Sequence, residues 1–315
     1  MGFVTTGLVD FVQEQQFPLI TKALAGGRTA SMITPVLGVK GPTELNMMDV
    51  DVNMSSDSGC TWDQSGNITY SQRLIDAKNV KINMEFCPKA LEQFYLRTQL
   101  APGAHTEALP FEEQFSNYLV EKIQDELEIV IWQGDASGAT GTNLDMFDGL
   151  LHDSASFVDC NTAAYGNALT TLTMADAVEA VQRVYALAPS AAVAKGDFKI
   201  FCGLDVFRLF ASALANGAGM TSGGGQLANY QSDFDPLRMI FPGTNIEVVG
   251  VNGLTGQTKV VGMNLSNAHY GTDLQEDSSS LELWYSQDDR KLKVACEFTY
   301  GTQIAFLDQV GAVLI

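Results

Sequence analysis

Residues 111–135 read FEEQFSNYLVEKIQDELEIVIWQGD, and residues 147–151 read FDGLL after an intervening glycine-containing loop. In the first stretch, apolar side chains recur every three or four residues, at Phe111, Phe115, Leu119, Ile123, Leu127 and Val130. This spacing is that of one face of an α-helix. We therefore predict an amphipathic helix over residues 111–132, about 30 Å long at roughly 1.5 Å per residue, with an acidic opposite face.

A second pattern, with a period of two residues, fills residues 36–86. Apolar residues alternate with polar ones first at Met48, Val50, Val52 and Met54, and again at Val80, Ile82, Met84 and Phe86. Such alternation indicates β-strands with one apolar face. The pattern predicts a long two-stranded hairpin over residues 36–86. Because a hairpin of this kind is marginal in water by itself, it needs a partner surface, either in its own domain or on a neighbouring subunit.

The remaining patterns mix helices and strands. Residues 1–25 predict short helices in a terminal arm, and residues 89–99 predict another short helix. A helix beginning after Thr173 has Asp176 three positions further on, which is a capping-box arrangement, and another begins at Asp205. Strands are predicted at residues 198–202, 246–251, 259–263, 281–285, 292–298 and 303–307. The fold class is therefore α+β.

Composition and charge exclude several classes of protein. The chain has 315 residues, 46% of them hydrophobic, and a net charge of −19, so it is globular and strongly acidic. A sequence-specific nucleic-acid binder needs a basic patch, and no window of this sequence supplies one. Acidity favours solubility, and an acidic wall could also face packed DNA without adhering to it. The five cysteines have wide spacings and form no CxxC pair, which favours reduced thiols.

The motifs that resemble catalytic or metal sites are incomplete. Residues 217–225 are glycine-rich but follow a helix, so a loop at a subunit contact is favoured over a phosphate-binding loop. Residues 49–53 begin like a calcium loop, but Met54 and Cys60 stand where such a loop has glycine and glutamate. The three histidines, at 105, 152 and 269, have no metal-ligand spacing. We predict no enzyme activity, no cofactor and no metal.

The order of these elements resembles the Hong Kong 97-type capsid fold of tailed-bacteriophage major capsid proteins. The segments that carry the resemblance are Trp132-Gln133-Gly134-Asp135, Phe147-Asp148-Gly149-Leu150-Leu151, Gly271-Thr272-Asp273-Leu274 and Gly301-Thr302-Gln303-Ile304. The resemblance covers nearly the whole chain. It implies an N-terminal arm at residues 1–35, an extended E-loop hairpin at 36–86, a peripheral domain with the long spine helix at 87–164 and 291–315, and an axial domain with a central sheet and flanking helices at 165–290.

The resemblance implies a structural function. The chain is expected to self-assemble as pentamers and hexamers into an icosahedral shell around a double-stranded DNA genome, which it encloses without sequence-specific binding. Expected partners are a separate scaffolding protein, since the chain begins almost at the arm, a portal and a decoration protein. Assembly is expected in the bacterial cytoplasm, with the product in the virion and no membrane association. Alternatives are an encapsulin-like nanocompartment shell protein, another virion structural protein of the tail or decoration type, and an unrecognised enzyme.

Four residues are candidates for contacts between subunits. Trp62, Arg73 and Lys78 lie in the predicted hairpin and are expected to dock it onto a neighbour, although Trp62 and Arg73 could equally pack within their own subunit. Met220 lies in the glycine-rich loop, which is expected at a subunit contact.

Replacing Trp62 with Ala is expected to block shell assembly while the monomer stays folded, because the substitution removes a docking side chain and leaves the core unchanged. Electron microscopy of the variant, with circular dichroism as the check on folding, tests this expectation. Normal shells from the variant would refute the docking role.

Overall fold

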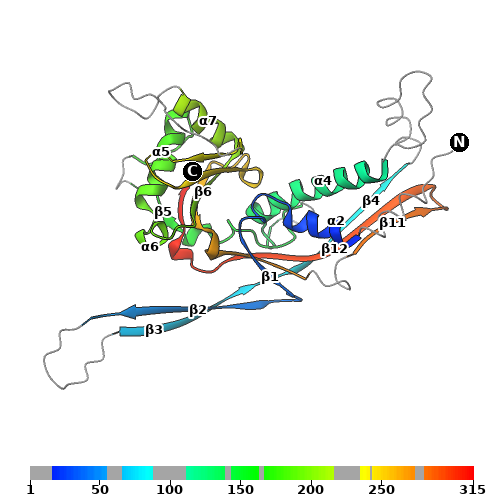
Figure 1. Ribbon diagram of the computed structural model, residues 1–315, viewed down its shortest axis with the longest axis horizontal. Helices are drawn as coiled ribbons and strands as arrows, with labels where there is room; N and C mark the ends of the chain where they lie inside the picture. Colours follow the sequence, from blue (N-terminus) through cyan, green and yellow to red (C-terminus); the bar gives the residue numbers. More distant parts are fainter. Residues whose placement is uncertain are drawn as a thin grey trace.

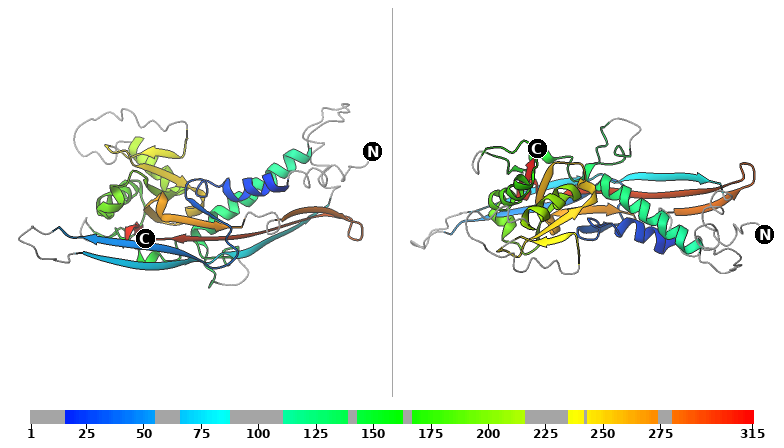
Figure 2. Two further views of the ribbon diagram at one scale, coloured as in Figure 1. Left: turned by 60° about the horizontal axis from the view of Figure 1, so that its bottom comes forward. Right: turned by 90° about the horizontal axis from the view of Figure 1, so that it is seen from above.

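The computed structural model describes residues 16–54, 66–87, 111–138, 143–162, 167–215, 235–241, 243–273 and 280–315. The described residues form three parts (Figure 1). One is a body of helices around a mixed sheet. The second is an elongated unit in which a long helix lies along several long strands. The third is a two-stranded hairpin that extends past the body, away from most of the other elements (Figure 2).

The predicted long helix is confirmed as α4 (Phe111–Gln133). Its apolar stripe is buried, with Leu119, Ile123, Leu127 and Val130 each less than 9% exposed. The exposed side carries acidic residues, among them Glu121 and Asp125. A second helix, α2 (Gln16–Ala25), packs along α4 (Figure 2). Within the described part of the chain, no helix combines the length and apolar character needed to cross a bilayer.

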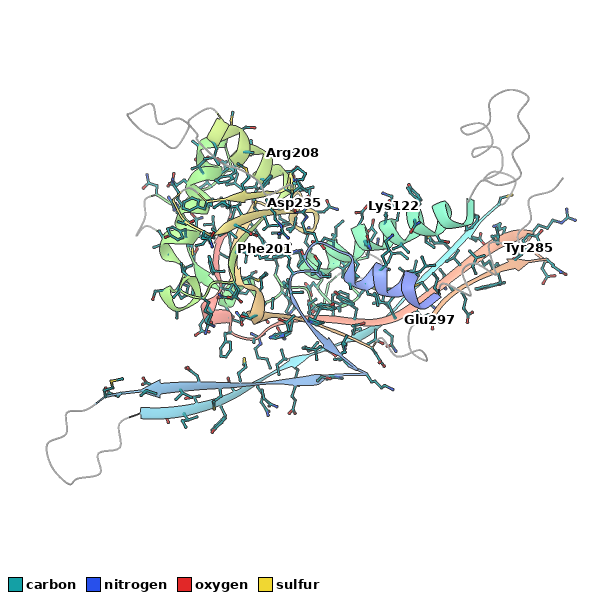
Figure 3. All side chains as sticks on the ribbon, viewed as in Figure 1. Lys122, Phe201, Arg208, Asp235, Tyr285 and Glu297 are labelled. Carbon is teal, nitrogen blue, oxygen red and sulfur yellow. The ribbon has the colours of Figure 1, made fainter. Side chains whose placement is uncertain are left out.

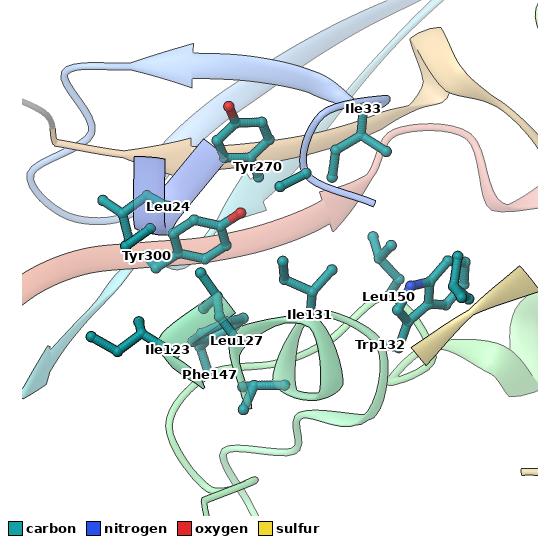
Figure 4. Packing of buried hydrophobic residues seen from close by; sticks show 14 of the residues in the cluster. Leu24, Ile33, Ile123, Leu127, Ile131, Trp132, Phe147, Leu150, Tyr270 and Tyr300 are labelled. Atoms are coloured by element: carbon teal, nitrogen blue, oxygen red, sulfur yellow. The ribbon is translucent and has the colours of Figure 1, made fainter. Parts of the chain in front are cut away.

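The elongated unit is built on a five-stranded sheet with the order β1-β10-β12-β11, in which β4 also pairs with β12. The strands are β1 (Thr34–Leu37), β4 (Lys78–Phe86), β10 (Ala268–Thr272), β11 (Ser280–Ser286) and β12 (Lys291–Ile304). Alternate residues of β12 point into the core against α4, from Leu292 to Tyr300. Figure 4 shows Tyr300 and Tyr270 of this sheet facing Ile123, Leu127 and Phe147.

The body is built on a six-stranded sheet with the order β5-β13-β9-β6-β8-β7. The strands are β5 (Val158–Asp159), β6 (Phe198–Gly203), β7 (Arg238–Ile240), β8 (Glu247–Val251), β9 (Lys259–Asn264) and β13 (Gly311–Leu314). Helices α5 (Met174–Leu187) and α7 (Leu204–Ala215) pack on each other and on this sheet, next to the short helix α6 (Ser190–Val193). The predicted capping box is confirmed, because Thr173 and Asp176 exchange side-chain to backbone hydrogen bonds.

Short 3-10 helices connect several of these elements. They are η1 (Ser154–Ser156), η2 (Asn252–Leu254), η3 (Leu265–Asn267) and η4 (Leu307–Gln309). The predicted strand at residues 303–307 is wrong in extent: β12 ends at Ile304, and η4 begins at Leu307. The predicted helix at residues 89–99 and the glycine-rich loop at 217–225 lie outside the described residues.

The hairpin is shorter than the 36–86 prediction. It consists of β2 (Thr43–Val52) and β3 (Gly66–Ile75), which pair antiparallel along their whole length. The next strand, β4, pairs instead with β12. Alternation indicates that a segment is a strand but carries no information about its partner, so the sequence pattern could not separate β4 from the hairpin. The sheets also cross the domain ranges expected from the sequence. Strand β13 lies in the range 291–315 but joins the six-stranded sheet, whereas β10 and β11 lie in the range 165–290 but join the five-stranded sheet.

The FDGLL segment closes the end of α4. A helix leaves its last carbonyl groups without partners inside the helix. Here Leu150 N donates to Ile131 O at 2.8 Å and Leu151 N donates to Trp132 O at 3.0 Å. Gly149 lies against the same turn, where an added Cβ would be 2.7 Å from Gly134 N and 2.8 Å from Val130 O. The segments at residues 132–135 and 147–151, which are adjacent in the order of motifs described above, therefore meet at one junction.

Replacing Gly149 with Ala is expected to lower the free energy of unfolding by about 1–3 kcal/mol, because the new methyl group collides with backbone atoms that have little freedom to move. Urea denaturation followed by circular dichroism measures the change. Gly196→Ala is the matched control, because an added Cβ there meets no atom within 4 Å. An equal loss in both variants would contradict the packing argument.

Candidate functional site

The hairpin presents an exposed apolar face. Residues directly opposite each other on antiparallel strands share one face of a sheet, and the register pairs Met48 with Tyr70 and Val50 with Ile68. These side chains are 58%, 74%, 45% and 51% exposed in that order. The opposite face carries Asp49 and other polar residues. Large exposed apolar patches are uncommon on soluble monomers, so this face is the candidate contact surface of the hairpin. Figure 3 shows side chains on both sides of these two strands.

The base of the hairpin is fixed to its own chain. The Arg73 guanidinium forms an ion pair with Asp153, and its Nη2 donates to Gln303 Oε1 at 3.1 Å. Gln303 Nε2 in turn donates to Leu74 O at 2.8 Å. The adjoining Ile75 is fully buried. The candidate contact residue Arg73 therefore anchors the hairpin within the subunit, and its role toward a neighbour stays a prediction.

The other candidate contact residues are not brought together with Arg73. Lys78 Nζ lies 2.7 Å from Asp76 Oδ2, and about half of the Lys78 side chain, 47%, remains exposed. Its position at the beginning of β4 leaves it accessible to another molecule. Trp62 and Met220 lie outside the described residues.

A groove of about 360 Å³ separates α4 from β4. Its walls are largely apolar, with Val80, Ile82 and Met84 on the strand side. The α4 side and the floor are formed by Leu119, Ile123, Leu127, Val130, Met146, Phe147 and Phe298. Lys122 projects from α4 at this groove (Figure 3), and Lys81 and Glu126 also line it. The groove is thus largely apolar, with a few charged residues in its lining.

A charged cluster forms at the junction that closes α4. His152 Nδ1 lies 3.5 Å from Asp148 Oδ1 and 3.7 Å from Asp135 Oδ1. Both carboxylates also accept backbone hydrogen bonds, from Ala136 and Ser137. The Ser137 hydrogen bonds lower the pKa of Asp135 below its usual value. Asp148 is four residues before His152, whereas Asp135 is more distant in sequence and is brought close only by the closure of α4, so the sequence did not reveal this cluster. We interpret the cluster as a polar contact that helps to hold the junction together.

Comparison with solved structures shows that this fold occurs in phage capsids. The chain is 9% identical to a chain of the satellite phage P4 procapsid, with a TM-score of 0.59, over 94% of this chain and 98% of that one. It is 11% identical to a chain of Gordonia phage Cozz, with a TM-score of 0.56, over 90% and 84% of the two chains. A capsid chain of the native GTA particle gives 11% identity and a TM-score of 0.53, over 92% and 89%.

At this low identity the likeness is one of fold. No protein-family model matches the sequence, and no curated protein matches it significantly. The mixed α and β fold is thus that of phage capsid chains, as the order of the sequence segments predicted.

Proposed function

We propose that this chain is a capsid protein that self-assembles as pentamers and hexamers into an icosahedral shell around double-stranded DNA. The observation that carries the proposal is the fold match to a procapsid chain over nearly the full length of both chains. The net charge of −19 suits a wall that encloses DNA without binding it in a sequence-specific way. The proposed role is structural rather than enzymatic, with the product in the virion.

In this proposal the parts take the places known from the Hong Kong 97-type fold. The β2–β3 hairpin is the E-loop, and α4 with the five-stranded sheet forms the peripheral domain. The six-stranded sheet with α5 and α7 forms the axial domain, and the segment before β1 belongs to the N-terminal arm. A separate scaffolding protein, a portal and a decoration protein are the proposed partners, with assembly in the host cytoplasm.

The hairpin supplies a contact between subunits in this proposal. Its ten-residue strands extend about 33 Å at roughly 3.3 Å per residue, far enough to reach a neighbouring molecule. Burial of its apolar face would stabilise the contact by about 25 cal/mol for each Å² of apolar surface removed from water. The groove between α4 and β4 of a neighbouring subunit is also largely apolar, and in this proposal it receives the apolar face of the hairpin. Because each subunit makes several such contacts, modest pair affinities combine into a stable particle.

Negative-stain electron microscopy of the expressed chain, alone and with candidate scaffolding proteins, tests the proposal. Closed shells or rings with five-fold and six-fold symmetry are the expected result. A stable, monodisperse monomer or dimer under every condition would overturn it. Shells that contain a protein cargo and no DNA would point instead to an encapsulin-like compartment.

A further inference from the structure

The β2–β3 hairpin extends past the body and meets the rest of the chain at its base (Figure 1). On β3 the residues from Gly66 to Gln72 are exposed, and burial begins only at Arg73, with Ile75 fully buried. A small rotation at the base is therefore carried to the far end of the strands. Because a ten-residue strand extends about 33 Å, a rotation of about 10° displaces its far end by roughly 6 Å.

The chain on both sides of the hairpin is packed closely against the five-stranded sheet. Val39, before β2, and Ile75, at the end of β3, are both buried. An added Cβ at Gly271 would lie 2.9 Å from Ile75 Cγ2 and 3.2 Å from Val39 Cγ2. Likewise, an added Cβ at Gly301 would lie 2.8 Å from Ala77 Cα. These contacts fix the point at which the hairpin is attached, whereas its outward direction depends on contacts made further along the strands.

The Arg73 side chain connects β3 to two other elements. Its guanidinium forms an ion pair with Asp153, which precedes η1, and its Nη2 donates at 3.1 Å to Oε1 of Gln303 in β12. The Gln303 amide is itself held in place. Its Nε2 donates to Leu74 O at 2.8 Å, and its Oε1 accepts a hydrogen bond of 3.0 Å from Ile304 N. Arg73 therefore contacts one partner on β12 and a second partner in the segment after α4.

The two partners of Arg73 belong to segments that are joined to each other. Thr302, next to Gln303 in β12, donates from its hydroxyl to Asp148 O at 2.8 Å, in the segment 147–151 that closes α4. Asp153 follows that segment directly. Although Asp153 occupies the N-cap position of η1, its side chain makes no capping hydrogen bond there. Its carboxylate is directed to Arg73 instead.

The exposure of the ion pair suits a contact that favours one direction of the hairpin without making it permanent. The Arg73 side chain is 20% exposed and the Asp153 side chain is 37% exposed. Ion pairs that remain accessible to solvent make a modest contribution, because water screens the attraction. This pair can therefore bias the hairpin toward one direction and still give way when the hairpin is drawn to a new partner.

We propose that the ion pair between Arg73 and Asp153, together with Gln303, sets the direction in which the hairpin leaves the subunit. Arg73 is a positioning residue: it controls the contact that the hairpin makes without itself touching a neighbour. The attraction between the two charges holds β3 toward the segment that follows α4. When that attraction is reversed, the hairpin stays attached through Val39 and Ile75 but adopts a range of directions.

Pulsed electron paramagnetic resonance on the unassembled chain tests the proposal. Spin labels on introduced non-natural residues, which leave the native cysteines unlabelled, replace Asp51 near the end of β2 and Glu121 on the exposed face of α4. Wild type should give one narrow distribution of distances between the two labels. Arg73→Glu places two like charges together, and a swing of roughly 20° moves the end of the strand by roughly 11 Å. We therefore expect this distribution to become about twice as wide.

Exchange of the two charges separates a positioning role from a purely structural one. The double variant Arg73→Glu/Asp153→Arg restores the attraction and should recover the narrow distribution, whereas loss of a residue needed only for folding would not be rescued in this way. Lys78→Glu is the matched control. It makes the same change of charge beside Asp76, whose Oδ2 lies 2.7 Å from Lys78 Nζ, but that pair lies outside the hairpin. Its distribution should match that of wild type.

An Arg73→Glu distribution that is as narrow as that of wild type and centred at the same distance would overturn the proposal. So would a double variant that stays as broad as Arg73→Glu, or equal broadening in Lys78→Glu. Should circular dichroism show that Arg73→Glu does not fold, Asp153→Asn provides a second test. It removes the attraction from the other partner and leaves η1 uncapped as before, so the same distribution should broaden.

Only the consequence for a shell rests on the proposed function. A hairpin without a fixed direction presents its apolar face to a neighbour at varying angles, so Arg73→Glu should give fewer closed shells and more variable diameters in electron microscopy, and the double variant should restore them. The distance measurement needs no shell. A failure of this proposal can therefore be distinguished from a failure of the proposed function.

Discussion

Replacing Trp132 with Ala is expected to lower the free energy of unfolding by about 3–5 kcal/mol, which is the usual cost of truncating a large buried aromatic side chain. Trp132 is fully buried at the last turn of α4, and its ring centroid lies 5.3 Å from that of Phe201 in β6. It therefore bridges the long helix and the six-stranded sheet. Its Nε1 also donates to the Thr29 hydroxyl, so the substitution removes a hydrogen bond that helps to hold the segment between α2 and β1 against α4.

Urea denaturation monitored by far-ultraviolet circular dichroism measures this loss without relying on tryptophan fluorescence. Trp284→Ala is the matched control, because Trp284 is 42% exposed on β11. Its substitution should change stability by about 0.5 kcal/mol or less. If Trp132→Ala cost no more than the control, Trp132 would not be a central packing residue. Its assignment as the bridge between α4 and the six-stranded sheet would then be wrong.

Single helices could be predicted from the sequence where the pattern that defines them lies within one short segment. The apolar period of α4 predicted the helix within one residue of its observed end, Gln133. The capping box at Thr173 marked the beginning of α5 in the same way. Both signals depend on residues three or four positions apart, so neither requires knowledge of the rest of the fold.

Partners in the sheets could not be predicted, because they depend on residues far apart in sequence. The strands β3 and β4 alternate equally well, but β3 pairs with β2 and β4 pairs with β12. Periodicity carries no information about that choice. For the same reason the sequence could not identify Asp153 as the partner of Arg73, and it left two possibilities for Arg73, a contact with a neighbour and packing within its own subunit.

Glu128 shows how a local pattern can mislead. The acidic residues of α4 were interpreted together as a solvent-exposed face, and Glu121 and Asp125 do lie there. Glu128 lies four residues before Trp132, which places it on the side of the helix that contacts Thr29, in the segment between α2 and β1. The spacing to Trp132 was a usable signal, but it became meaningful only once Thr29 was found against both side chains. Buried charges of this kind depend on tertiary contacts.

Replacing Tyr70 with Asp is expected to abolish assembly while leaving the subunit folded. Tyr70 is 74% exposed on the apolar face of the hairpin, opposite Met48, so the monomer loses little by the change. In an assembled shell the same position would be covered by a neighbour, and burying an unpaired carboxylate there is strongly unfavourable. The contact recurs in every subunit, so a cost at one contact is multiplied across the particle. Electron microscopy should therefore show no particles where wild type forms shells.

Ser71→Asp is the matched control, because it places the same charge one residue further along β3, on the opposite face of the hairpin beside Met47. Shells from Ser71→Asp together with none from Tyr70→Asp would assign the contact to the apolar face. Loss of assembly in both variants would indicate a general effect of negative charge on a chain that already carries −19. Normal shells from Tyr70→Asp would show that the apolar face stays exposed in the particle. The exposure of Met48, Val50 and Ile68 would then require a different explanation, such as a contact with a partner protein that joins after the shell has closed.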